Sequence, residues 1–109
     1  GILMHFVNNS TAVFSFWLSD DPNATRKGYV SGAADLADTV KGCFLGQADD
    51  WCTTPSQSIN YASCHDNMTL LDRITKSTPG ASKEDHIRMN NLSAAIYMTA
   101  QGIPFLQAG

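Results

Sequence analysis

The clearest hydrophobic pattern lies in the last quarter of the chain. Apolar or weakly polar side chains recur there at helical spacing: Ile87, Met89, Leu92, Ala95, Ile96 and Thr99. Ser82, followed three residues later by Asp85, is typical of a capped helix start. The pattern therefore predicts a helix over about Ser82 to Ala100.

Short strands are predicted on both sides of this helix. Gly102 supplies the positive φ that a helix end commonly needs, and Pro104 prevents the helix from continuing. Ile103 to Leu106 is therefore assigned to a strand. Before the helix, Ser58 to Cys64 mixes β-forming with small residues after the turn signal Pro55-Ser56. The order strand, loop, helix, strand is a βαβ unit, whose right-handed crossover makes the two strands parallel.

The first half of the chain has weaker periodicity. Asp35 to Val40 predicts a short helix that ends near Gly42 or Gly46. Ala12 to Leu18 is a nearly continuous apolar run, which favours a buried strand, and Gly1 to Val7 is read as another strand.

Three chemically active side chains follow the strand at Ser58 to Cys64 directly. They are His65, Asp66 and Asn67. In parallel α/β architectures, ligands bind at the carboxyl ends of the strands. The triplet is therefore the candidate functional site of the chain.

Composition narrows the possible partners. The chain has 109 residues, of which 43% are hydrophobic and 16% charged, and these values fit at most one globular domain. The net charge of -3 gives no basic surface for nucleic acid, and no apolar run approaches the roughly 18 residues of a membrane span. We expect neither nucleic acid nor a membrane as partner.

The cysteines do not form a metal-binding pattern. Cys43, Cys52 and Cys64 include no Cys-x-x-Cys pair and no Cys/His cluster. They are interpreted as ordinary buried thiols. No metal site and no cofactor is predicted.

Three motifs resemble one enzyme family. Residues 59–72, INYASCHDNMTLLD, resemble the end of the seventh barrel strand in α-amylase-superfamily glycoside hydrolases, and His-Asp-Asn-x-Thr-Leu resembles type I pullulanases in particular. KGYVSG at 27–32 with DTVK at 38–41 resembles the linker before that strand. QGIPFLQAG at 101–109 resembles the eighth strand with the start of its loop. Isoamylase-like debranching enzymes more often have glycine where Asn67 stands.

The resemblance implies a fold. The expected class is α/β, a fragment of a (β/α)8 TIM barrel that covers about the last two or three strands, because a whole barrel takes roughly 250 residues. Residues 1–109 would form a partial catalytic barrel domain, in which 27–109 resemble the barrel end and 1–26 depart from the family's sixth strand. The remainder of the barrel would be its partner.

The resemblance also implies a function. The parent would be a hydrolase that binds α-glucan and cleaves α-1,6-glucosidic branch linkages in pullulan, amylopectin or limit dextrins. Asp66 and His65 would be catalytic as stabilisers of the transition state, and both would bind substrate together with Asn67. An ionised Asp66 can accept hydrogen bonds from two neighbouring sugar hydroxyls, and His65 can donate to the same region. Supporting roles are implied for Tyr61, Thr69 and Leu70.

One departure from the family concerns the catalytic activity of the isolated chain. Retaining hydrolysis needs two carboxyl groups roughly 5 Å apart. The family's nucleophilic Asp follows the fourth strand and its acid/base Glu the fifth, and neither motif occurs here. The chain alone is therefore predicted to be inactive.

Other interpretations remain open. The chain could be a non-catalytic carbohydrate-binding or interaction module derived from such a barrel, or part of an isoamylase-like enzyme. A metal-dependent phosphohydrolase would need ligands beyond the His-Asp pair, and only His5 and His86 remain. His86 is expected to be solvated or to lie behind a site residue. Trp51, in a polar segment, is a weaker candidate for stacking on sugar rings, whereas Trp17 is expected in the core.

Overall fold

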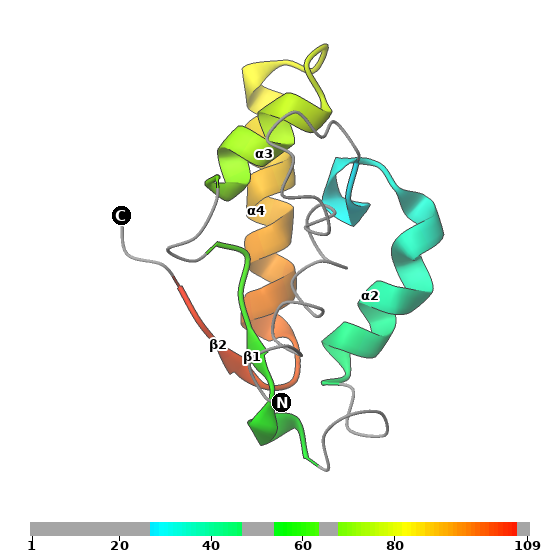
Figure 1. Cartoon of the computed structure of the whole chain (residues 1–109), viewed down its shortest axis with the longest axis vertical. Helices are drawn as coiled ribbons and strands as arrows, with labels where there is room; N and C mark the ends of the chain where they lie inside the picture. The colour runs from blue at the N-terminus through cyan, green and yellow to red at the C-terminus, as the bar shows by residue number, and fades with distance from the viewer. Residues whose placement is uncertain (1–26, 47–53, 64–67, 107–109) are drawn as a thin grey trace.

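The computed structural model describes residues 27–46, 54–63 and 68–106, and every structural statement below refers to these residues. The strands predicted at 1–7 and 12–18 lie outside them. The described elements are, in chain order, η1 (Tyr29–Ser31), η2 (Ala34–Leu36), α2 (Ala37–Phe44), η3 (Pro55–Gln57), β1 (Ile59–Asn60), α3 (Leu70–Ser77), α4 (Lys83–Thr99) and β2 (Ile103–Pro104). Figure 1 shows α4 as the long central helix, with α3 near one end and the two strands near the other.

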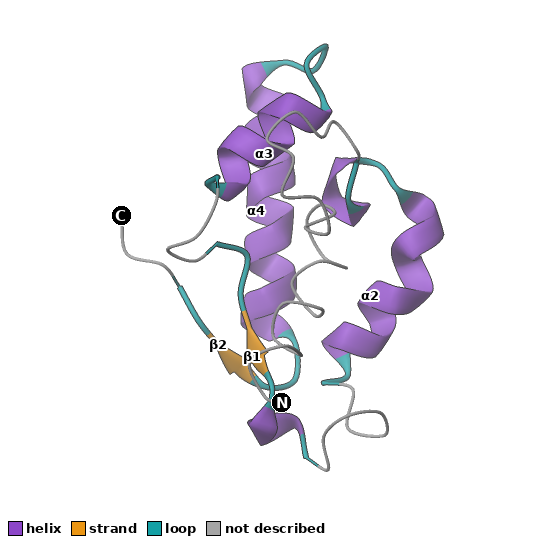
Figure 2. Ribbon diagram, in the orientation of Figure 1, coloured by secondary structure: helices purple, strands orange, loops and turns teal. Residues whose placement is uncertain are grey.

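The two strands form the predicted parallel pair. Ile59 is aligned with Ile103, and Asn60 with Pro104 (Figure 2). The strands are shorter than the predicted 58–64 and 103–106, although backbone bonds from Ile103 N to Ser58 O (2.9 Å) and from Phe105 N to Asn60 O (2.8 Å) flank Pro104. Since the residues on both sides of Pro104 donate these bonds, its missing N–H costs no bond to β1.

Helix α4 has the predicted ends. The Ser82 hydroxyl accepts a hydrogen bond from Asp85 N at 3.1 Å, and Gly102, beyond the helix end, has φ of 118°. Only part of the apolar stripe is buried, since Met89 and Ile96 pack against the core. His86, Ser93 and Tyr97 are buried, because the face that carries them packs against α3 and η1, whereas Ile87 and Leu92 are 44% and 46% exposed.

Helix α3 is a correction to the predicted loop between strand and helix. Thr69 caps it, since its hydroxyl accepts from Asp72 N (3.2 Å) and donates to the Asp72 carboxylate (2.7 Å). Its buried apolar residues are Leu70 and Ile74, four positions apart. The i, i+4 spacing of these two residues and the Thr69-x-x-Asp72 start are the sequence signals that could have identified the helix.

Helix α2 confirms the short helix predicted at Asp35 to Val40 and extends it to Phe44. Gly46 follows with φ of 78°, and a Cβ at this position would lie 2.9 Å from the Pro55 Cβ. Gln101 joins this end of α2 to β1: its N–H donates to Phe44 O (2.8 Å), and its carbonyl accepts from the Asn60 side-chain amide (2.8 Å).

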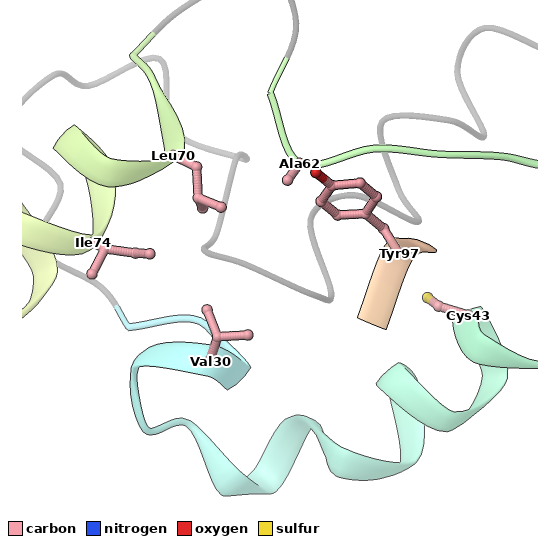
Figure 3. Close-up of a cluster of buried hydrophobic side chains, with 6 residues drawn as sticks. All are labelled: Val30, Cys43, Ala62, Leu70, Ile74 and Tyr97. Carbon is pink, nitrogen blue, oxygen red and sulfur yellow. The ribbon is translucent and has the colours of Figure 1, made fainter. Parts of the chain in front are cut away.

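The buried core brings together side chains from η1, α2, α3 and α4 and from the segment that follows β1. Its members, drawn in Figure 3, are Val30, Cys43, Ala62, Leu70, Ile74 and Tyr97. Helix α4 packs against α3, α2 and η1, so the core lies between α4 and the segments around it. None of the described helices is long and apolar enough to cross a membrane.

Candidate functional site

The predicted site residues His65, Asp66 and Asn67 lie outside the described residues, as does Cys64 before them. The structure therefore defines the two flanks of the site rather than the site itself. Both flanks are fixed by contacts that the sequence patterns did not predict.

The chain approaches the triplet from the carboxyl end of β1. The Tyr61 ring packs edge-on against Phe105, which follows β2, with ring centroids 5.9 Å apart and planes at 80°. Ala62 is buried in the core. Since β1 and β2 are parallel, the segment that carries the triplet begins at the carboxyl end of the sheet, as the sequence predicts.

The chain leaves the triplet into the N-terminus of α3. The N–H of Leu70 donates to the Ser63 hydroxyl at 3.1 Å. Leu70 is the first residue of the helix and is buried, and Thr69 is the helix cap. The Ser63 hydroxyl therefore joins the residue before Cys64 to the first turn of α3.

A pocket of about 280 Å³ lies between these flanks and α4. Its described lining includes Ser63, Thr69, Asn90, Tyr97, Phe105 and Leu106. The other lining residues, Ala62, Leu70, Leu71 and Ala94, are apolar, and none of the lining side chains is charged. Burial raises the pKa of the Tyr97 hydroxyl above its ordinary value. In Figure 3 that hydroxyl lies beside Ala62, close to the carboxyl end of β1.

His86 does not have its expected place. It is only 8% exposed, and its Nε2 lies 2.8 Å from the backbone carbonyl of Thr78. Because His86 is in the first turns of α4 and Thr78 follows α3, the contact ties the two helices together. The other aromatic and histidine candidates, Trp17, Trp51 and His5, lie outside the described residues.

The described residues hold no group of three or more His, Cys, Asp or Glu side chains that could bind a metal ion. Cys43 is a buried thiol, as the sequence predicts for this cysteine, and desolvation raises its pKa to about 11. At neutral pH it is therefore a neutral apolar group rather than a nucleophile or metal ligand.

Comparison with curated proteins finds pullulanases. The chain is 42% identical over 60 residues to pullulanase 1 of Arabidopsis thaliana, covering 54% of the chain and 6% of that protein. It is 38% identical over 107 residues to the Klebsiella pneumoniae pullulanase, covering 84% of the chain and 10% of that protein. No family model matches the chain.

Comparison with solved structures also finds pullulanases. The Bacillus acidopullulyticus pullulanase matches 94% of the chain and 12% of its own length, with a TM-score of 0.85 and 34% identity. A Paenibacillus barengoltzii pullulanase in complex with maltohexaose and α-cyclodextrin matches 93% of the chain and 16% of its own length, with a TM-score of 0.81 and 40% identity. The resemblance seen in the motifs is confirmed, and the chain spans only a small part of each of these relatives.

Proposed function

We propose that this chain, a relative of one segment of pullulanases, is part of a glycoside hydrolase that cleaves α-1,6-glucosidic branch linkages in pullulan, amylopectin or limit dextrins. In this proposal the chain covers about the last two or three strands of a (β/α)8 barrel. The parallel strands β1 and β2 belong to that barrel, and α3 and α4 lie in the connection between them. The remainder of that barrel is its partner, and an α-glucan is its substrate.

One observation carries the proposal. The chain matches a pullulanase over 94% of its length at a TM-score of 0.85, and its sequence has a His-Asp-Asn triplet that begins five residues after β1. A fold supports many activities, so the fold alone would not suffice. Fold and triplet together favour a glycan site at this end of the sheet.

The proposed chemistry assigns a role to each member of the triplet. The ionised Asp66 carboxylate accepts hydrogen bonds from neighbouring sugar hydroxyls, and His65 donates to the same ring. These bonds strengthen as the ring flattens and gains positive charge near the transition state, so they lower the barrier more than they tighten ground-state binding. Asn67, which has both a donor and an acceptor, binds substrate at the pocket edge.

Substitution of Asp66 in the complete protein tests this function. Asp66→Ala should lower kcat on pullulan roughly a hundredfold or more while the folded protein keeps its Tm, since a group that acts in the transition state contributes to kcat. His65→Ala should lower kcat by less. Steady-state kinetics and thermal melts on the same preparations provide the measurement.

A carboxylate on α4 provides the matched control. Asp85 is half-exposed and forms a surface ion pair with Arg88 at 3.6 Å. Asp85→Asn should leave kcat unchanged, because surface pairs contribute little. A folded Asp66→Ala protein with the kcat of the unsubstituted enzyme would refute the proposed function.

A further inference from the structure

We propose that the pocket between α3, α4 and the carboxyl end of the parallel strands binds a neutral, hydroxylated ring of about the size of one sugar unit. Its wall comes from the residues after β1, the start of α3, one face of α4 and the residues after β2. The binding site consists of these described residues alone. It depends neither on the position of the triplet nor on the hydrolysis proposed above.

The pocket has room for one small molecule. Its volume is about 280 Å³. For comparison, an apolar cavity of about 150 Å³ in another protein binds benzene. The larger space here is sufficient for a six-membered ring that carries hydroxyl groups.

The Tyr97 hydroxyl is the observation that carries the proposal. The residue is only 7% exposed, and its hydroxyl lies beside Ala62, which also lines the pocket (Figure 3). Among the described residues this hydroxyl has no hydrogen-bond partner. The oxygen itself is not enclosed, so a ligand in the pocket can reach it. Since the hydroxyl of a buried tyrosine usually has a partner, this one is available to a ligand.

Two further polar side chains of the wall can bond to the same ligand. Asn90 lies seven residues before Tyr97, on the same face of α4, and its amide has no partner among the described residues. The Ser63 hydroxyl accepts from Leu70 N at 3.1 Å, and its own hydrogen has no acceptor in the described part of the chain. These groups both donate and accept hydrogen bonds, as the hydroxyl groups of a ligand do.

The rest of the wall defines the class of the ligand. None of the lining side chains is charged, so an ionised ligand would lose its hydration without gaining an ionic partner. The apolar part, which includes Ala94 and Phe105, suits the C–H groups of a ring. A few polar groups on an otherwise apolar wall are typical of small-molecule sites. A neutral sugar ring combines C–H groups with hydroxyl groups and carries no charge, so it fits this wall.

Glucose is the probe, and the complete protein with Asp66→Ala is the background. That substitution removes the carboxylate assigned to the glycan site, so the proposed active site does not account for differences between the variants below. Titration by saturation-transfer NMR should give a Kd in the millimolar range, as is usual for so small a ligand. Tyr97→Phe should raise this Kd about fivefold, because it removes one hydrogen bond. It should not lower the Tm, since the hydroxyl has no partner to lose.

Tyr29 provides the matched control. It packs against the same core but lines a different groove, beside Leu92 and Ile96. Tyr29→Phe also removes one tyrosine hydroxyl and should leave the Kd for glucose unchanged. Ala94→Leu places a larger side chain in the pocket and should abolish the binding that depends on Tyr97. Asn90→Leu replaces it should Ala94→Leu lower the Tm.

Four results would overturn the proposal. The first is no saturable binding of glucose to the background protein. The second is a Kd that Tyr97→Phe and the larger side chain leave unchanged, and the third is an equal weakening by Tyr29→Phe. The fourth is binding of benzene, or of the gluconate anion, as tight as that of glucose, because the ligand would then be neither hydroxylated nor neutral by necessity. Because the titration involves no hydrolysis, the kcat of Asp66→Ala tests the proposed function separately, and either proposal can fail alone.

Discussion

Among single residues, Ser93 on α4 stands in the least favourable surroundings. It is fully buried, and it has the one buried side-chain oxygen among the described residues that lacks a hydrogen-bond partner. Burying an unpaired hydroxyl costs about 1–3 kcal/mol. Ser93 therefore reduces the stability that the helix gains by packing.

Ser93→Ala should raise the free energy of unfolding by about 1 kcal/mol, because it removes the unpaired oxygen and leaves only a small void. Ser77→Ala is the matched control, since Ser77 is also buried but donates to the Ile74 carbonyl at 3.1 Å. That variant should be neutral or less stable. Urea unfolding of both variants gives the values, and a destabilised Ser93→Ala protein would contradict the argument.

The Cys43 thiol should make the free energy of unfolding depend on pH, and the shift of its pKa gives the sign. Desolvation raises its pKa from 9.0 to about 11 in the folded protein. Below pH 9 the thiol is protonated in both the folded and the unfolded state and adds no slope. Between pH 9 and 11 only the unfolded thiol releases its proton, so the free energy of unfolding should fall as pH rises.

Cys43→Ala isolates this effect from the other groups that titrate at high pH, Tyr97 among them. The difference in unfolding free energy between the two proteins should be constant from pH 7 to 8.5 and should then shrink toward pH 11. Urea titrations at a series of pH values measure it. A difference that stays constant throughout would show that the thiol ionises equally in both states.

At the scale of elements, the predictable features were those that a few residues determine locally. Ser82 caps α4 through Asp85, and Gly102 has the left-handed φ that its position needs, so both ends of the helix followed from sequence. The buried face followed only in part. Met89 and Ile96 of the apolar stripe pack against the core, but Ile87 of the same stripe is exposed. The buried His86 and Ser93 do not belong to that stripe. Which face is covered depends on the neighbouring elements, and helical periodicity alone does not identify them.

Gly102 gives a prediction for the parallel strand pair. Its φ is 118°, and an added Cβ would lie 2.8 Å from the Asn60 side-chain nitrogen and 2.9 Å from the Ser58 carbonyl oxygen. Gly102→Ala should therefore lower the free energy of unfolding by about 2 kcal/mol or more, through backbone strain and displacement of β1.

Gly80→Ala is the comparison variant, because a Cβ there meets nothing within 4 Å. Its unfolding free energy should stay within about 0.5 kcal/mol of the original. Thermal or urea unfolding compares the two, and equal effects would show that the crowding at Gly102 is relieved cheaply.

For the site, the sequence predicted the triplet and its place after a strand, but not the contacts of the residues on either side. His65 to Asn67 could be named because three polar side chains follow the strand predicted at 58–64 and match a family motif. The bond between Ser63 and Leu70 could not, since a serine before a loop has many possible partners and only the placement of α3 selects one. The position of the triplet itself stays a prediction.

At the scale of the whole molecule, the 109-residue chain assayed alone should release no reducing sugar from pullulan above a buffer control. Retaining hydrolysis needs a nucleophile and an acid, and the motifs of the α-amylase superfamily that carry them do not occur in the sequence. A complete pullulanase assayed in parallel confirms that the substrate and the detection work. Activity of the pure chain would mean that other carboxyl groups can perform the chemistry.

The bonds of Gln101 imply an order of assembly. Its N–H meets Phe44 and its carbonyl meets Asn60, and both partners are far away along the chain. Closing such long loops costs more conformational entropy than closing the short connection between α3 and α4. We therefore expect α3 and α4 to pack together early and the pairing of β1 with β2 to form late. Substitutions around Gln101 should then mainly speed unfolding and leave the folding rate nearly unchanged.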